Sequence, residues 1–351
     1  DGRTCTRGTT VAVPPYVMSE RTPRSTIHLA VTVMALLGCG ESTSYVEPTR
    51  EEPPATEPPP ETTPTEDAEP APRPLPTGCA PAPRAGHQTI TCDDGTTFDV
   101  EASTTCARGG CGIILDVHGW SMNGPMEDRH TRMRELATPR GYVVVQPTAP
   151  GRPPSWTRGQ PTGRDFAWDD TVWSFLQATL QVFDIDPDRV HMTGFSQGAQ
   201  MTFRFMFRQP ELFASIAPIA GPDGFAIPNL IGKVSKTGEA PRVPVPILYT
   251  HGTKDRMLTH DEVVPSLTEE ITRAYGLSTS EPIESGPAYR AQRWAKDGRV
   301  MFELWVHDFE QKNFYVAGHC VPGPVNEGDG AFLRSDTPFR CVDEGQFDFG
   351  K

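Results

Sequence analysis

The sequence predicts an α/β fold, with a mostly parallel β-sheet that is covered by helices on both faces. Beyond residue 79, continuous apolar runs with the length of buried strands alternate with segments of helical spacing. Several of these runs end in glycine or proline, as the turns between strands and helices commonly do. The 351 residues can hold one large domain of this kind with appendages, or two modest domains, and show no internal repeat.

Each element follows from its own pattern. "TTFDVEAS" alternates between apolar and polar residues, and "CGIILDVHG" is a continuous apolar run that ends at His118 and Gly119. The strands are expected, in chain order, at 96–103, 111–119, 141–150, 189–195, 214–221, 243–252 and 300–309. The helices are expected at 168–183, 197–209 and 261–277, the second halted near Pro210 and the third interrupted early by Pro265.

The first 78 residues do not read as part of this domain. Residues 1–17 lack a periodic pattern and precede a plausible start at Met18, so we expect them to lie outside the native protein. Residues 18–39 have the three-part layout of an export signal and end in Leu-Leu-Gly-Cys, which resembles a bacterial lipobox and makes Cys39 the expected lipidation site. A plain signal peptide or a short buried helix are the alternatives.

Residues 40–78 are expected to form a disordered tether to a catalytic domain at 79–351. This stretch is crowded with prolines, and residues 41–78 carry nine acidic side chains against two arginines. Such a composition buries too little apolar surface to offset chain entropy. The net charge of the whole chain is −13, which argues against nucleic acid as a partner because phosphate contacts need a basic surface. The membrane, reached through a lipid on Cys39, is the expected partner.

The cysteines predict disulfides. Setting aside Cys5 and Cys39 leaves six, an even number that suits an exported protein. No CxxC pair has a matching partner, so a zinc site is not expected and we assign no metal. Pairing neighbours along the chain gives Cys79–Cys92, Cys106–Cys111 and Cys320–Cys341.

The segment "GFSQGAQ" at 194–200 raises the question of why a serine stands between two glycines where a strand gives way to a helix. G-x-S-x-G in this position is the signature of the nucleophile elbow of an α/β-hydrolase fold. The turn exposes the hydroxyl of Ser196, and the start of the following helix can bind an oxyanion. The sequence therefore predicts a nucleophile at Ser196.

A serine nucleophile needs a base and an acid, which follow it in the order acid, then histidine in this fold. Asp255 follows the strand at 243–252, and His319 lies in a Gly- and Pro-rich loop after the last strand. The rivals for these two roles are Asp261 and Glu262 among acids, and His118, His251, His260 and His307 among histidines. The expected oxyanion donors are the backbone N–H groups of Trp120 and Gln197.

The central segment "DIDPDRVHMTGFSQGAQMTFRFMFRQPELFASIAPIAG", with "HGTKD" and "GHCVPG", resembles the secreted polyhydroxybutyrate depolymerase and feruloyl esterase family of α/β hydrolases. The resemblance covers roughly residues 79–345 and implies a triad of Ser196, Asp255 and His319. It also implies a cofactor-free serine carboxylester hydrolase that acts on feruloyl or acetyl-type esters or on polyhydroxyalkanoate-type polyesters. Cys320 and Val321 depart from the family pattern after the histidine, which puts the substrate in doubt.

Two other functions stay open: a serine peptidase of the same fold, and a non-catalytic surface lipoprotein that uses the fold for binding. An aromatic cleft wall would favour a feruloyl or polyester substrate. Four side chains could form it, or could equally belong to the core: Trp120, Trp156, Phe166 and Trp168. An extracytoplasmic protein, anchored to a bacterial membrane or secreted, is expected in either case.

Overall fold

The computed structural model describes residues 74–158, 165–221, 241–310, 316–322 and 341. All of them belong to the second of two compact units, residues 68–351. Cys39, the expected signal and most of the expected tether lie outside the described residues.

One sheet of ten strands organises the described residues, in the order β1-β2-β4-β3-β5-β6-β7-β10-β9-β8. The six central strands, β4-β3-β5-β6-β7-β10, are parallel to one another. Two antiparallel strands extend the sheet at each edge, β1 and β2 at one and β8 and β9 at the other. The strands are β1 Gly86–Thr91, β2 Thr97–Ala102, β3 Gly112–Val117, β4 Tyr142–Thr148, β5 Val190–Phe195, β6 Ser215–Ile219, β7 Ile247–Gly252, β8 Ser280–Gly286, β9 Tyr289–Lys296 and β10 Arg299–His307.

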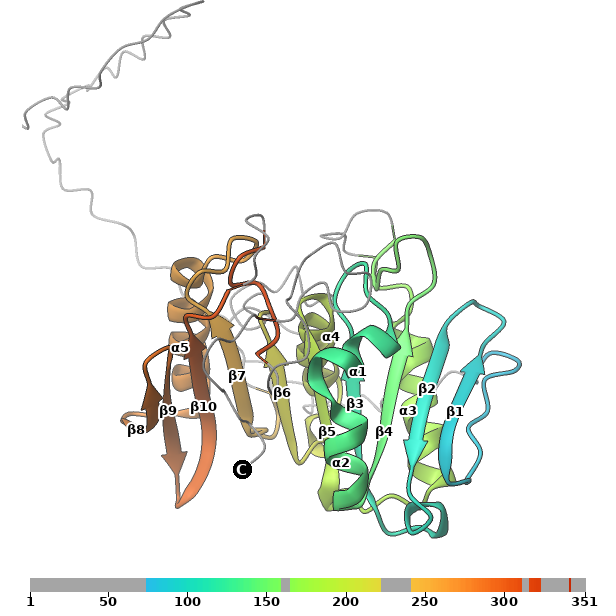
Figure 1. Ribbon diagram of the computed structural model, residues 1–351. Helices are drawn as coiled ribbons and strands as arrows, with labels where there is room; N and C mark the ends of the chain where they lie inside the picture. The colour runs from blue at the N-terminus through green and yellow to red at the C-terminus, as the bar shows by residue number, and fades with distance from the viewer. Residues whose placement is uncertain (1–73, 159–164, 222–240, 311–315, 323–340, 342–351) are drawn as a thin grey trace, which may run out of the picture. The chain divides into compact units, whose positions relative to one another are not determined.

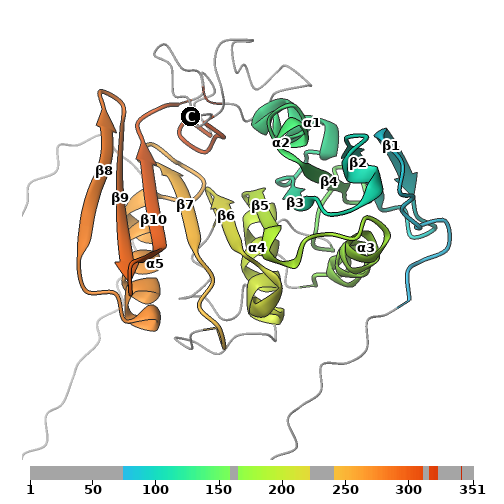
Figure 2. The same cartoon turned by 90° about the horizontal axis from the view of Figure 1, so that it is seen from below.

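Helices cover both faces of the sheet, so the predicted α/β-hydrolase architecture is confirmed. The helices α1 and α2 lie on one face, and α3, α4 and α5 lie on the other (Figures 1 and 2). The α-helices are α1 Gly124–Thr131, α2 Met133–Ala137, α3 Asp169–Val182, α4 Gln197–Arg208 and α5 His260–Tyr275. Central strands such as β4 are buried along almost their whole length, as a sheet covered on both faces requires.

The structure differs from the sequence prediction at several elements. The helix α5 continues through Pro265, because this residue lies near the helix start and its ring costs only one backbone hydrogen bond there. The strands β1, β8 and β9 and the helices α1 and α2 were not predicted. The edge strands carry many exposed polar residues, and α1 has no strong apolar stripe, so their patterns are weak.

Residues 74–78, just before the expected domain start at residue 79, contact the described fold. Leu75 packs against the main core, and the carbonyl of Thr77 accepts a hydrogen bond from the Asp93 amide at 3.1 Å. The part of the chain that the structure describes includes no helix with the length and apolar character needed to cross a membrane.

Candidate functional site

Ser196 occupies a sharp turn between β5 and α4. Its backbone lies at φ 53° and ψ −110°, which is a strained conformation for a residue with a side chain. A Cβ on Gly194 would lie 2.6 Å from the backbone carbon of Gly198, and a Cβ on Gly198 would overlap the carbonyl of Val117 at the end of β3. Both glycines are therefore required because the helix start, β5 and β3 approach one another closely.

The structure brings the three expected triad residues together. The Nε2 atom of His319 lies 3.1 Å from the Ser196 hydroxyl oxygen, and its Nδ1 atom lies 2.7 Å from Oδ2 of Asp255. Asp255 and His319 are buried, whereas Ser196 is partly exposed. This is the geometry in which an imidazole can take a proton from a serine hydroxyl while a carboxylate orients it.

The loop after β7 holds the Asp255 carboxylate from its other side. Its Oδ1 atom accepts hydrogen bonds from the backbone amides of Met257 and Leu258, both at 2.8 Å. With His319 on Oδ2, both oxygens of the buried carboxylate have donors. These bonds fix the plane of the carboxylate.

Two loops that are far apart in sequence present the acid and the base as one unit. Asp255 and Ala317 form an isolated antiparallel bridge, and the Gly318 amide donates to the Lys254 carbonyl at 2.9 Å. A Cβ on Gly318 would lie 2.6 Å from the Asp255 nitrogen, so a larger residue would push the loops apart. The ring of Phe195, the residue before the nucleophile, packs on the His319 ring with centroids 4.9 Å apart.

The two expected oxyanion donors, Trp120 and Gln197, stand at the ends of two neighbouring elements. Gln197 is the first residue of α4, where backbone N–H groups have no acceptor within the helix. Trp120 follows β3, and its amide donates to no acceptor among the described residues. The Gln197 side chain accepts from the Trp156 amide at 3.1 Å and so ties the nucleophile turn to the loop after β4.

One of the four side chains expected in an aromatic cleft wall lies in the core. Trp156 is 1% exposed, its ring lies at a tilt against that of His118, and it donates its indole N–H to the His118 carbonyl at 2.8 Å. Trp168 packs against the main core, and Phe166 lies under the guanidinium of Arg204. Trp120, Phe166 and Trp168 are all partly exposed, so these three stay candidates for a substrate contact.

The rivals Asp261, Glu262 and His118 occupy other places in the fold. The Asp261 side chain is fully exposed at the start of α5, and Glu262 is exposed beside it. His118 shapes the turn after β3, because its Nδ1 atom donates to the Gly119 carbonyl and its Nε2 atom accepts from the Ala149 amide. Burial lowers the pKa of His118 to about 4, so this ring stays neutral near pH 7.

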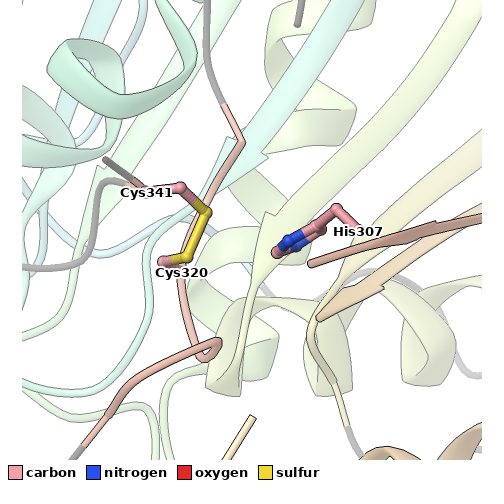
Figure 3. Close-up of side chains that lie close together, drawn as sticks. All are labelled: His307, Cys320 and Cys341. Atoms are coloured by element: carbon pink, nitrogen blue, oxygen red, sulfur yellow. A yellow bond between two sulfur atoms is a disulfide. The ribbon is translucent and has the colours of Figure 1, made fainter. Parts of the chain in front are cut away.

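The three expected disulfides, Cys79–Cys92, Cys106–Cys111 and Cys320–Cys341, are all present. The third begins at the residue after His319. The described residues contain one set of side chains with the spacing of metal ligands, namely His307, Cys320 and Cys341. Figure 3 shows His307 beside the bonded sulfur atoms of these cysteines, which in this form offer no thiolate to a metal.

A cavity of about 630 Å³ lies away from the triad, between α5 and the strands β8, β9 and β10. Its lining includes none of Ser196, Asp255 and His319, so we assign it no part in the chemistry.

Sequence reasoning missed the groups that support the triad. The amides of Met257 and Leu258 carry no signal in a sequence, because any residue except proline offers one. The close approach at Gly318 could have been suspected, since "AGH" places a glycine directly before the expected base.

Comparison with known proteins supports an esterase. Residues 169–278 match the family described as Phospholipase/Carboxylesterase, a stretch that includes Ser196 and Asp255 but ends before His319. The bifunctional acetylxylan esterase/xylanase XynS20E of Neocallimastix patriciarum is 30% identical over 158 residues, which are 43% of this chain and 20% of that protein. An acetylxylan esterase of Coprinopsis cinerea is 26% identical over 215 residues, 54% of this chain and 56% of that protein.

A solved structure is similar over most of its own length. The acetyl xylan esterase from Aspergillus awamori matches with a TM-score of 0.51 at 16% identity and covers 64% of this chain and 92% of that one. At this identity the likeness shows the fold. The chain spans 20% of the length of the Neocallimastix protein and 56% of the length of the Coprinopsis protein.

Proposed function

We propose that the protein is an exported serine carboxylester hydrolase with Ser196, His319 and Asp255 as its triad. The observation that carries the proposal is the unbroken path from the Ser196 hydroxyl through His319 to the Asp255 carboxylate, with contacts of 3.1 and 2.7 Å. The similarity to carboxylesterases and acetylxylan esterases points to the same chemistry.

The reaction would run through an acyl-enzyme. His319 takes the Ser196 proton as the hydroxyl attacks the ester carbonyl, and Asp255 stabilises the imidazolium that forms. The amides of Trp120 and Gln197 bind the negative oxygen of the tetrahedral intermediate. His319 then protonates the departing alcohol, and a water activated by the same base releases the acid. No cofactor takes part in these steps.

Acetyl esters on a carbohydrate are the substrates that we favour. Acetylxylan esterases recur among the similar proteins. A feruloyl group would gain most from aromatic side chains on an open cleft wall, whereas Trp156 is buried and the other three candidates are only partly exposed. Feruloyl esters and polyhydroxyalkanoates are therefore the comparison substrates.

Export is part of the proposal. Three disulfides form readily in an oxidising compartment and rarely persist in a reducing one.

Activity assays on the Ser196→Ala and His319→Ala variants test the proposed chemistry. Each change should lower kcat on acetylated xylan by several orders of magnitude, and the double variant should be little worse, because triad members act as a unit. Methyl ferulate and short-chain polyhydroxybutyrate should turn over more slowly than acetylated xylan. Full esterase activity in Ser196→Ala would overturn the proposal. Faster hydrolysis of amides than of esters would indicate a peptidase. A protein that a fluorophosphonate does not label would be a binding protein.

A further inference from the structure

A buried histidine stands directly behind the acid of the triad. His251 lies near the end of β7, four residues before Asp255, and its side chain has no exposed surface. Its Nε2 atom lies 2.8 Å from the Leu258 carbonyl oxygen and 3.5 Å from Oδ2 of Asp255. A carbonyl oxygen can only accept a hydrogen bond, so Nε2 of His251 carries a hydrogen whether the ring is neutral or charged.

The other side of this ring is anchored to the same strand. Nδ1 of His251 lies 2.9 Å from the Tyr249 hydroxyl, which also contacts the carbonyl oxygen of Gly221 at 2.5 Å. Burial lowers the pKa of His251 to about 4, although the neighbouring Asp255 opposes this effect. The ring is therefore neutral near pH 7. Its Nδ1 atom and the Gly221 carbonyl compete for the one hydrogen of the Tyr249 hydroxyl, which holds this side of the ring in place.

Leu258 links this histidine to the acid. Its carbonyl accepts from His251, and its amide donates to Oδ1 of Asp255 at 2.8 Å. The carboxylate is thus oriented by a loop that is itself fastened to a central strand. The other titratable groups around His251 are His260 on α5, His319 and, from β10, His307.

We propose that His251 is a positioning residue for the esterase reaction. His251 fixes the acid loop through Leu258 and so aligns Asp255 with His319. This inference rests on the proposed function, because it assigns the residue a role in that triad. A packing role alone would affect the stability of the fold, whereas a positioning role affects turnover in molecules that are folded.

The test compares His251→Gln, His251→Leu and Tyr249→Phe with wild type, on the full chain. The glutamine amide can replace the Nε2 donor, so His251→Gln should keep kcat within about threefold of wild type. Leucine cannot donate, and His251→Leu should lose about 10- to 100-fold in kcat with little change in KM, the cost expected of a slightly misplaced catalytic group. Tyr249→Phe keeps the aromatic ring and should show a smaller loss in the same direction.

Titration with a fluorophosphonate counts the folded active sites, so a loss through misfolding is separated from a loss in turnover. His191→Leu is the matched control, since His191 lies on β5 and bonds Ser215 away from the triad. Equal kcat per active site in wild type, His251→Leu and Tyr249→Phe would overturn the inference while the esterase proposal stood. Activity in Ser196→Ala would instead overturn the proposed function itself.

Discussion

The Asp255 carboxylate is bound differently at its two oxygens, and this asymmetry makes a sharp prediction. In Asp255→Asn the two amide donors at Oδ1 should retain the carboxamide oxygen, which leaves the NH₂ group facing His319. His319 would then accept on Nδ1 and carry its hydrogen on Nε2, where it cannot take the serine proton. We expect kcat to fall on the order of 10⁴-fold with a small change in KM.

Asp261→Asn is the control for this choice of acid, because the Asp261 side chain is fully exposed. Steady-state kinetics should find this variant near wild type. If Asp261→Asn were the crippling change and Asp255→Asn harmless, the acid would be misassigned.

A second residue prediction concerns Glu127 on α1. This side chain is fully buried. Among the described residues, neither of its carboxyl oxygens has a donor, and Oδ1 of Asp116 has none either. Burial and the neighbouring Asp116 raise the pKa of Glu127 well above its usual value, so Glu127 keeps its proton and can donate it to Asp116. Burial likewise raises the pKa of Asp116 to about 6.

The raised pKa values of Glu127 and Asp116 determine whether the free energy of unfolding rises or falls with pH. Above the usual pKa of glutamate the unfolded chain has lost a proton that the folded protein keeps, so the free energy of unfolding falls as pH rises. Glu127→Gln supplies a permanent donor and should reduce the fall between pH 5 and pH 8 by about 1 kcal/mol. Urea unfolding at both pH values measures it, with the exposed Glu135→Gln as control. An unchanged slope in Glu127→Gln would refute the shared proton.

At the scale of elements, a buried ion pair joins α3 to α4, the helix that follows the nucleophile. Arg204 binds the Asp169 carboxylate through two nitrogens, at 2.5 and 2.7 Å, and is 4% exposed. Asp169→Asn leaves a buried guanidinium without its counter-charge and should lower the free energy of unfolding by about 3 kcal/mol. Asp170→Asn, which affects the more exposed pair with Arg208, should cost less than about 1 kcal/mol in the same denaturant titration. Equal losses in both variants would contradict this account.

The elements that the sequence predicted are those whose burial produces a clear apolar or glycine pattern. The strand β4 has the apolar run Val143–Val145 and is buried along most of its length, and the turn before α4 is signalled by its glycines. The edge strands β8 and β9 give no such signal, because β8 is exposed at most of its described positions and β9 buries only two of its eight residues. The candidate triad could be assembled from the order of the motifs. The proposed role of His251 could not, because it depends on a hydrogen bond to the carbonyl of Leu258, seven residues later, which no sequence pattern signals.

At the scale of the whole molecule, negative charge is densest, per residue, in the stretch 41–78. Nine of the acidic side chains lie within residues 41–78, against two arginines, whereas the whole chain has a net charge of −13. The sequence predicts that this stretch is a solvated tether between the expected lipid on Cys39 and the catalytic domain.

The last prediction follows from that arrangement and concerns Cys39, which lies outside the described residues. We expect the protein expressed in a bacterium to carry a diacylated or triacylated Cys39, motivated by Leu36, Leu37 and Gly38 directly before it. Two or more acyl chains anchor a protein stably, whereas a single chain binds only marginally. Wild type should therefore sediment with membranes and show the lipid mass on its N-terminal peptide, and Cys39→Ala should not. Because the triad does not depend on the anchor, detergent-solubilised wild type and the purified domain 74–351 should have equal kcat on a soluble acetyl ester. A mature form that is cleaved elsewhere and free of lipid would show that the protein is released instead.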